Sequence, residues 1–164
     1  MILIEPTIQA RFGRALRQRA LAAFLRQAAE AAGLAGQVSV LLTGDSHIRR
    51  LNREFRRKDH PTDVLSFPAA EPGPRAIAGD LAISVDTAAR QATEFGHPLA
   101  TELQILVLHG VLHLGGYDHE ADGGQMARKE ARLRRQFGLA AGLIERTEKP
   151  AARKRASARG RGRR

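Results

Sequence analysis

The chain has 164 residues, of which 43% are hydrophobic, and it carries a formal net charge of +10. This length and apolar content predict one domain with its own core and exclude a fibrous or wholly disordered chain. Cysteine is absent, which excludes disulfides and thiolate metal sites and favours a reducing, cytoplasmic setting.

The positive charge is concentrated at the C-terminal end. Residues 150–164 hold seven basic and no acidic residues, whereas the rest of the chain holds 20 basic and 17 acidic residues, a net charge of +3. Because this tail has no large apolar side chain to bury, we expect a single folded domain over residues 1–148 and a disordered basic tail over 149–164. Such a tail is compatible with a role in solubility or with sequence-independent binding to RNA phosphates.

No segment has the pattern of a membrane anchor. The N-terminal region interrupts its apolar residues with arginines, unlike an export signal. The longest apolar run, residues 105–116, contains two histidines and is too short to span a bilayer. We therefore expect no membrane partner.

Apolar periodicity and turn residues predict an alternation of helices and strands. In chain order, we expect a helix over 11–32 ended by Gly33, a strand over 37–43, a short helix capped by Asp45 or Ser46, a strand over 63–67, a loop over 71–78, a strand over 79–85, a helix over 87–95 capped by Asp86, a helix from Pro98 to Leu114, and a helix from Asp122 to Phe137. The helix that ends at Leu114 is apolar nearly all round and should be central. This order predicts an α+β fold, with a small mixed β-sheet of about four strands covered by helices.

Three histidines constrain the chemistry most tightly. His109, His113 and His119 lie in the segment HGVLHLGGYDH, at intervals of four and six residues. Residues four apart share one face of a helix, so the central helix carries two imidazoles that can reach one metal ion. Two glycines then allow the chain to leave the helix and return with the third histidine. Three nitrogen ligands leave a tetrahedral Zn²⁺ with an open position, as in catalytic zinc sites.

The general base of zinc peptidases is missing from this pattern. Peptidases with histidines at these three positions carry a glutamate directly after the first, in HExxHxxGxxH, and here that position is Gly110. A glycine inside a helix allows close packing against the sheet or close approach of a substrate. Its presence argues against a peptidase of that class.

A cluster of arginines offers a binding site for phosphate. It comprises Arg49, Arg50, Arg53, Arg56 and Arg57 around the predicted short helix. The planar guanidinium group suits the charge that develops on a phosphodiester during cleavage. A solvated basic helix face would give the same pattern for most of these residues.

Three stretches of the chain together resemble the YbeY family of bacterial single-domain endoribonucleases and rRNA maturation factors. They are LNREFRRKDHPTDVLSFP (51–68), GDLAIS (79–84) and HGVLHLGGYDH (109–119), within a similarity that extends from about Val38 to Gly138. The basic tail lies outside the family pattern.

The resemblance implies a zinc-dependent, single-strand-specific endoribonuclease that acts on single-stranded RNA. It implies a role in 16S rRNA maturation at the 3′ end and in ribosome quality control, with rRNA and the small ribosomal subunit as partners. One Zn²⁺ per chain would be held by His109, His113 and His119. The family's functional arginine matches Arg56, and we assign catalytic roles to Arg56 and His113.

Other residues of the matched motifs have two interpretations each. Arg53 and Arg57 join Arg56 as candidate RNA-binding residues. Asp63, Ser66 and Asp80 either line the cleft or cap turns and end strands. Asp118 either orients an imidazole through its second nitrogen or caps its loop.

Two rival functions follow from the same residues. The first is a metallopeptidase or another amide hydrolase, which Gly110 opposes. The second is a non-enzymatic ribosome assembly factor in which zinc is structural and the tail binds RNA. Imidazole ligands also suit nickel, copper and iron, although zinc fits the spacing best.

Overall fold

The computed structural model describes residues 1–70 and 77–139. The helices and strands in chain order are β1 (Ile2–Ile4), α1 (Pro6–Phe12), the 3₁₀ turn η1 (Gly13–Leu16), α2 (Gln18–Ala31), β2 (Gln37–Thr43), α3 (Asp45–Arg56), β3 (Val64–Pro68), β4 (Ile77–Ser84), α4 (Val85–Phe95), α5 (Leu99–Leu114) and α6 (Gln125–Gln136). The expected α+β class is confirmed.

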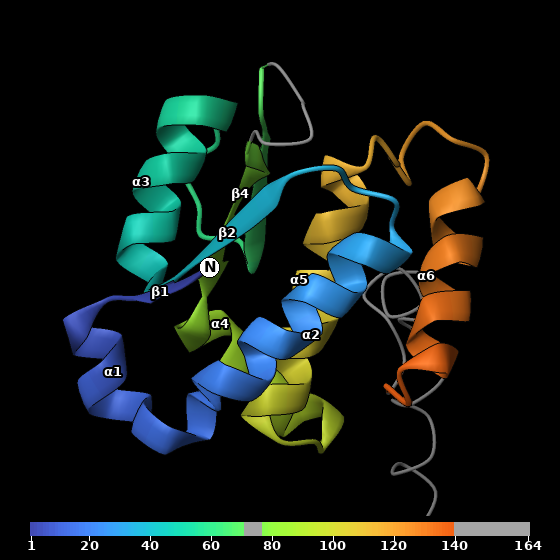
Figure 1. Cartoon of the computed structure of the whole chain (residues 1–164). Helices are drawn as coiled ribbons and strands as arrows, with labels where there is room; N and C mark the ends of the chain where they lie inside the picture. Colours follow the sequence, from blue (N-terminus) through green and yellow to red (C-terminus); the bar gives the residue numbers. More distant parts are fainter. Residues whose placement is uncertain (71–76, 140–164) are drawn as a thin grey trace, which may run out of the picture.

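The four strands form one mixed sheet in the order β1-β2-β4-β3. β1 pairs with β2, and β2 with β4, in parallel, while β3 runs antiparallel to β4 with Val64 opposite Ile83. β1 and β3 are therefore the two edge strands of this sheet. Figure 1 shows the sheet between α3 on one side and α2, α5 and α6 on the other.

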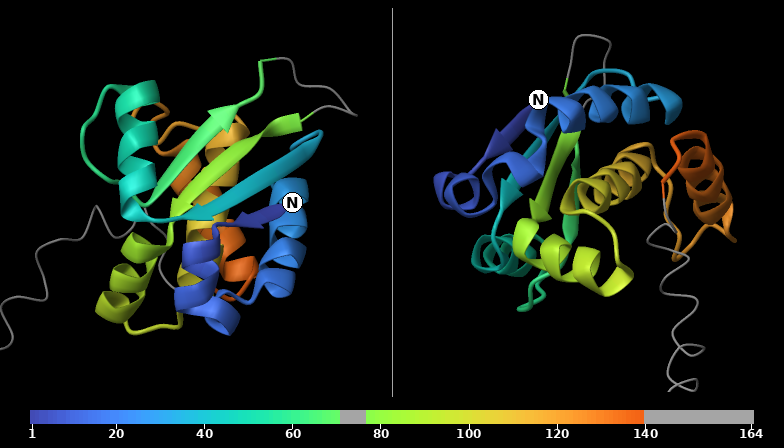
Figure 2. Two further views of the ribbon diagram at one scale, coloured as in Figure 1. Left: turned by 90° about the vertical axis from the view of Figure 1, so that its left-hand side faces the viewer. Right: turned by 90° about the horizontal axis from the view of Figure 1, so that it is seen from below.

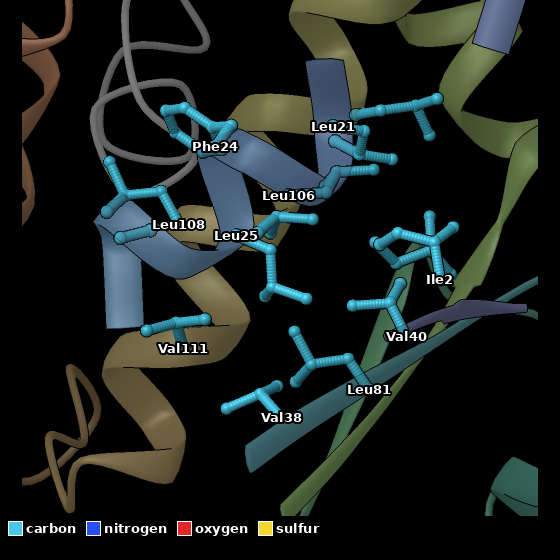
Figure 3. Packing of buried hydrophobic residues seen from close by; sticks show 14 of the residues in the cluster. Ile2, Leu21, Phe24, Leu25, Val38, Val40, Leu81, Leu106, Leu108 and Val111 are labelled. Atoms are coloured by element: carbon cyan, nitrogen blue, oxygen red, sulfur yellow. The ribbon is translucent and has the colours of Figure 1, made fainter. Parts of the chain in front are cut away.

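The larger core lies between the sheet, α2 and α5. The views of Figure 2 show α2 and α5 on the same face of the sheet, with α6 packed outside α5. Alternation along each strand directs Val38, Val40 and Leu81 toward Leu25, Leu106 and their neighbours, as Figure 3 shows. A smaller cluster of Ile48, Leu65 and Ala82 forms beneath α3 on the opposite face. Because apolar residues surround α5, this helix is buried along its length and holds its side chains in fixed positions.

The expected helix over 11–32 was wrong in its first part. The chain turns through η1, where φ is positive at Gly13 (43°) and at Arg17 (45°), and Arg17 adopts the left-handed conformation. The continuous helix is α2, which Gly33 follows in a left-handed conformation as predicted. Ile8 and Leu16 are both buried, so packing of α1 and η1 against the body selects the break. β1 was not predicted because three residues carry too little periodicity.

Two helix caps also differ from the prediction. Gly44, not Asp45 or Ser46, is the N-cap of α3, and Ser84, not Asp86, caps α4 by accepting a hydrogen bond from Thr87 N–H. The two carboxylates instead connect the elements. Asp45 accepts hydrogen bonds from Ser84 and two residues of α4, and Asp86 accepts one from the backbone N–H of Asp45. These hydrogen bonds connect the N-terminal ends of α3 and α4.

Several expectations concern residues beyond the described part of the chain. Most of the predicted loop over 71–78 and all of the predicted basic tail over 149–164 lie there, as does the domain boundary at 148. The strand predicted over 79–85 begins earlier, at Ile77. None of the helices in the described part is long and apolar enough to cross a membrane.

Candidate metal centre

The site begins at the C-terminal end of α5. His109 and His113 are one turn apart on this helix, and their ring centroids lie 4.8 Å apart. His109 is buried, with 4% of its surface exposed, and His113 is half-buried. Burial of α5 between the sheet, α2 and α6 therefore determines where both imidazoles point.

A tight turn after α5 returns the chain to the same place. Gly116 adopts a left-handed conformation with φ of 87°, and Tyr117 N–H donates a 3.2 Å hydrogen bond to the carbonyl of Leu112. The turn places the ring of His119 5.3 Å from each of the other two imidazole rings. Each histidine offers a ring nitrogen, and these nitrogens lie within 4.8 Å of one another. The structure thus brings together all three histidines that the sequence singled out.

The hydrogen bonds of the first two histidines indicate their tautomers. His109 Nδ1 lies 2.9 Å from Glu130 Oε1, and His113 Nδ1 lies 3.0 Å from the carbonyl oxygen of Tyr117. Both oxygens accept hydrogen bonds, so each Nδ1 carries a hydrogen, and Nε2 is the ring nitrogen that each histidine can offer to a metal ion.

The two Nε2 atoms face each other at 3.1 Å. Two lone pairs at that distance repel unless a cation lies beside both. Tetrahedral Zn–N bonds of about 2.0–2.1 Å place two ligand nitrogens roughly 3.3 Å apart, close to the observed separation. The donor set and its geometry therefore fit a metal ion.

A bridging proton is the alternative to a metal ion between these rings, and the surroundings oppose it. Burial lowers the pKa of His113 below its ordinary value, and the neighbouring His109 and His119 lower it further. The Tyr117 carbonyl and Asp118 act in the opposite direction but do not outweigh burial. Burial and the two neighbouring histidines thus favour the neutral form of the His113 ring, which is the form that binds a metal ion.

Sequence reasoning missed Glu130. This residue lies on α6, is 2% exposed and hydrogen-bonds to His109. A signal was present in the sequence, because Met126, Glu130 and Leu133 are spaced by four and three residues on the buried face of α6. A carboxylate within an apolar stripe marks a buried polar contact.

A polar cleft of about 770 Å³ contains the histidines and extends toward β3. Arg56 lines it, and the Arg56 Nη2 donates a 3.0 Å hydrogen bond to the carbonyl of Ser66 on the edge strand. Lys58 and His60, which sequence reasoning did not single out, also line this cleft. Arg56 and Lys58 therefore bring positive charge to a cleft that acidic side chains also line, namely Asp63, Glu94, Asp118 and Glu120.

The other two predicted RNA-binding arginines lie outside the cleft. Arg53 and Arg57 are exposed, and neither is among the residues that line the cleft. Arg57 ends α3 in a left-handed conformation with φ of 56°, so the chain turns there toward Lys58. Among the arginines of α3 and its C-cap, Arg56 is the one that lines the cleft.

The remaining motif residues fall into three groups. Asp63 and Ser66 line the cleft, but their hydrogen bonds are structural: Asp63 accepts from Val64 N–H and Gln91, and Ser66 Oγ donates to the carbonyl of Gly110. Asp118 also lines the cleft, and it accepts from Glu120 N–H, as expected for a loop cap. Asp80 is exposed on β4 and is not among the lining residues, so of its two expected roles the structure does not support a place in the cleft.

Gly110 is explained by packing of α5 on the sheet. A Cβ at this position would lie 2.8 Å from one methyl carbon of Leu81 and 3.3 Å from a methyl carbon of Val64. A side chain as long as glutamate has no room there. Of the two roles expected for this glycine, the structure supports helix packing.

Comparisons with known proteins agree with this geometry. A family model described as "Endoribonuclease YbeY" matches residues 5–138. The chain belongs to the YbeY family. The match starts well before Val38, so the similarity includes α1 and α2 as well as the motifs.

Individual members of the YbeY family are similar over most of their length. A Koribacter versatilis protein named "Endoribonuclease YbeY" is 55% identical over 134 residues, covering 82% of this chain and 86% of that protein. One of the same name from Solibacter usitatus is 51% identical over 133 residues, covering 81% and 88%. A solution structure of a Thermotoga maritima protein is 28% identical, with a TM-score of 0.54, and covers 94% of this chain and all of that one.

Proposed function

We propose that this protein is a metal-dependent endoribonuclease that cleaves single-stranded RNA. The observation that carries the proposal is the convergence of His109, His113 and His119 in a cleft that Arg56 and Lys58 also line. The names of its YbeY relatives, which describe endoribonucleases, support the same activity.

Different residues of the cleft bind the metal ion and the RNA phosphates. His109, His113 and His119 would hold one Zn²⁺, which would supply Lewis-acid chemistry. Arg56 binds the scissile phosphate, because its guanidinium is held at the rim by the Ser66 carbonyl and keeps other donors available. Lys58 and His60, which line the same cleft, bind neighbouring phosphates.

We propose that this activity acts in 16S rRNA maturation at the 3′ end and in ribosome quality control in the cytoplasm, as the resemblance to the YbeY family implies. Its partners are then rRNA and the small ribosomal subunit. The seven basic residues of 150–164 add sequence-independent contacts to RNA phosphates. Deleting 150–164 should make the salt dependence of RNA binding shallower, by about 0.7 per lost phosphate contact on a single strand.

Two variants and a control test the proposal. His113→Ala should lose both bound zinc and cleavage of a single-stranded RNA. Arg56→Ala should keep its zinc but lower kcat/KM by roughly 10- to 100-fold, since a charge-assisted hydrogen bond contributes about 1.5–3 kcal/mol. The control is Arg49→Ala, on the same helix, where the guanidinium pairs with Asp59 and lies outside the cleft. Full cleavage by zinc-free His113→Ala protein would refute the proposal.

The same preparation distinguishes the rival functions. A peptide panel should remain uncleaved, because Gly110 occupies the position of the peptidase base. A chelator should abolish cleavage while the circular dichroism spectrum stays that of a folded protein. Loss of the fold on chelation, with no cleavage by the zinc-loaded protein, would favour the structural zinc of an assembly factor.

A further inference from the structure

Helix α6 attaches to the body through a narrow face that has a carboxylate at its centre. Its buried residues are Met126, Glu130 and Leu133, while most of its other residues are charged or polar. A carboxylate that is 98% removed from solvent destabilises the packing of a helix unless a polar partner compensates it. The partner of Glu130 therefore matters for how α6 docks.

That partner is the most buried histidine of the metal centre. Glu130 Oε1 accepts a 2.9 Å hydrogen bond from Nδ1 of His109, and both side chains are almost fully buried, at 2% and 6% exposure. The bond holds the hydrogen on Nδ1 and turns the Nε2 lone pair toward His113, 3.1 Å away. Glu130 thus determines both the tautomer and the direction of His109.

We infer that Glu130 is a positioning residue of the metal centre, which fixes His109 as an Nε2 ligand and couples the docking of α6 to metal occupancy. The inference rests on the metal site of the proposed function. A carboxylate on the outer nitrogen of a histidine raises the basicity of the ligand and restricts its rotation. A bound cation in turn compensates the buried charge of Glu130.

A second buried pair provides an internal comparison. His97 contacts the fully buried Glu102 near the start of α5. Its chemistry matches that of the His109–Glu130 pair, but in the described part of the chain His97 belongs to no group that could hold a metal ion. Loss of the carboxylate should therefore affect stability in both pairs and metal affinity in only one.

The coupling between α6 and the metal ion is reciprocal. If loss of the Glu130 contact weakens metal binding by a given factor, metal binding must favour the docked α6 by that same factor. For a carboxylate that orients a ligand, this factor is on the order of 10- to 100-fold. Amide exchange through undocking of α6 should slow by the same amount when zinc binds.

The first measurement compares zinc affinity by chelator competition in the full chain. Glu130→Gln keeps the shape of the side chain and removes its charge, and Glu102→Gln is the matched control. We expect Kd to rise 10- to 100-fold in the first variant and to stay within twofold in the second. Unchanged affinity in folded Glu130→Gln protein, or equal losses in both variants, would overturn the inference.

The second measurement does not require the variant to fold. In the wild-type protein, ¹⁵N NMR should show His109 with hydrogen on Nδ1, and hydrogen exchange in residues 125–136 should slow by 10- to 100-fold on adding zinc. The inference would be contradicted by hydrogen on Nε2 of His109, or by hydrogen exchange in α6 that does not change when zinc binds. A wild-type protein that binds no zinc would refute the metal site of the proposed function, and the inference with it.

Discussion

Replacing Gly110 with alanine tests whether close packing of α5 on the sheet accounts for the glycine beside the first histidine. The added Cβ would lie 2.8 and 3.0 Å from the two methyl carbons of Leu81, where carbon atoms prefer about 3.5–4.0 Å. Leu81 is 1% exposed, so its side chain has little space to move. The contact should cost about 1–3 kcal/mol.

Helix propensity acts in the opposite direction. Alanine is about 1 kcal/mol better than glycine inside a helix, which offsets part of the clash. The net expectation for Gly110→Ala is a loss of about 1 kcal/mol, or a fall of roughly 2–4 °C in Tm for a chain of this size. Urea unfolding followed by circular dichroism measures the free energy, and a thermal scan measures Tm.

A double-mutant cycle separates packing from propensity. Leu81→Ala removes both methyl carbons that the new Cβ would meet, so only the propensity gain and the small contact with Val64 remain. In that background Gly110→Ala should stabilise the protein by up to about 1 kcal/mol, a coupling of roughly 2 kcal/mol between the two sites. The packing argument would be refuted if Gly110→Ala left the free energy of unfolding unchanged. It would also be refuted if the substitution had the same cost in the wild-type and Leu81→Ala backgrounds.

Three further predictions concern stability. Burial raises the pKa of Asp45, but hydrogen bonds from Ser84, Thr87 and Arg90 outweigh it and leave the pKa below its ordinary value. Their stabilisation is therefore present above the unfolded pKa of about 3.9 and lost as pH falls through the lower folded value. Asp45→Asn should be less stable by about 1–3 kcal/mol at pH 7, with a smaller difference at pH 3, and urea titrations giving equal differences would contradict this. Gly79→Ala should lower the free energy of unfolding by more than about 3 kcal/mol in the same assay. Gly79 has a φ of 155°, and the added Cβ would lie 2.7 Å from a backbone oxygen of β3. A cost smaller than that of Gly110→Ala would contradict this prediction. Zinc at 100 times its Kd should stabilise the protein by about 2.7 kcal/mol, and an unchanged Tm in a thermal scan would exclude specific binding.

The metal trio was predictable because its geometry is almost entirely local. His109 and His113 share a helix face through the 3.6-residue period, and two glycines allow the turn that returns His119. The central position of α5 could also be predicted from the sequence, because a helix that is apolar on all sides is buried. These features depend on residues that are close together in the chain, so the sequence alone is enough to predict them.

The partners of these residues depend on packing between distant segments. Glu130 meets His109 across 21 residues, and Arg56 meets the Ser66 carbonyl because α3 and β3 lie side by side at the edge of the sheet. Nothing in local periodicity distinguishes Arg56 from Arg53 or Arg57, although Arg56 is the one that lines the cleft.

The break at Gly13 and the helix caps were missed for the same reason. Ile8 and Leu16 continue a helical pattern in the sequence, but both are buried against the body only if the chain turns between them. The sequence by itself determined the α+β class, the helix that carries two histidines and the ligand spacing, because local periods and turn residues encode them. Only the tertiary structure decided which carboxylate contacts His109, that Arg53 and Arg57 do not line the cleft with Arg56, and which of the two roles expected for Gly110 applies. Those choices depend on contacts between segments far apart in the chain.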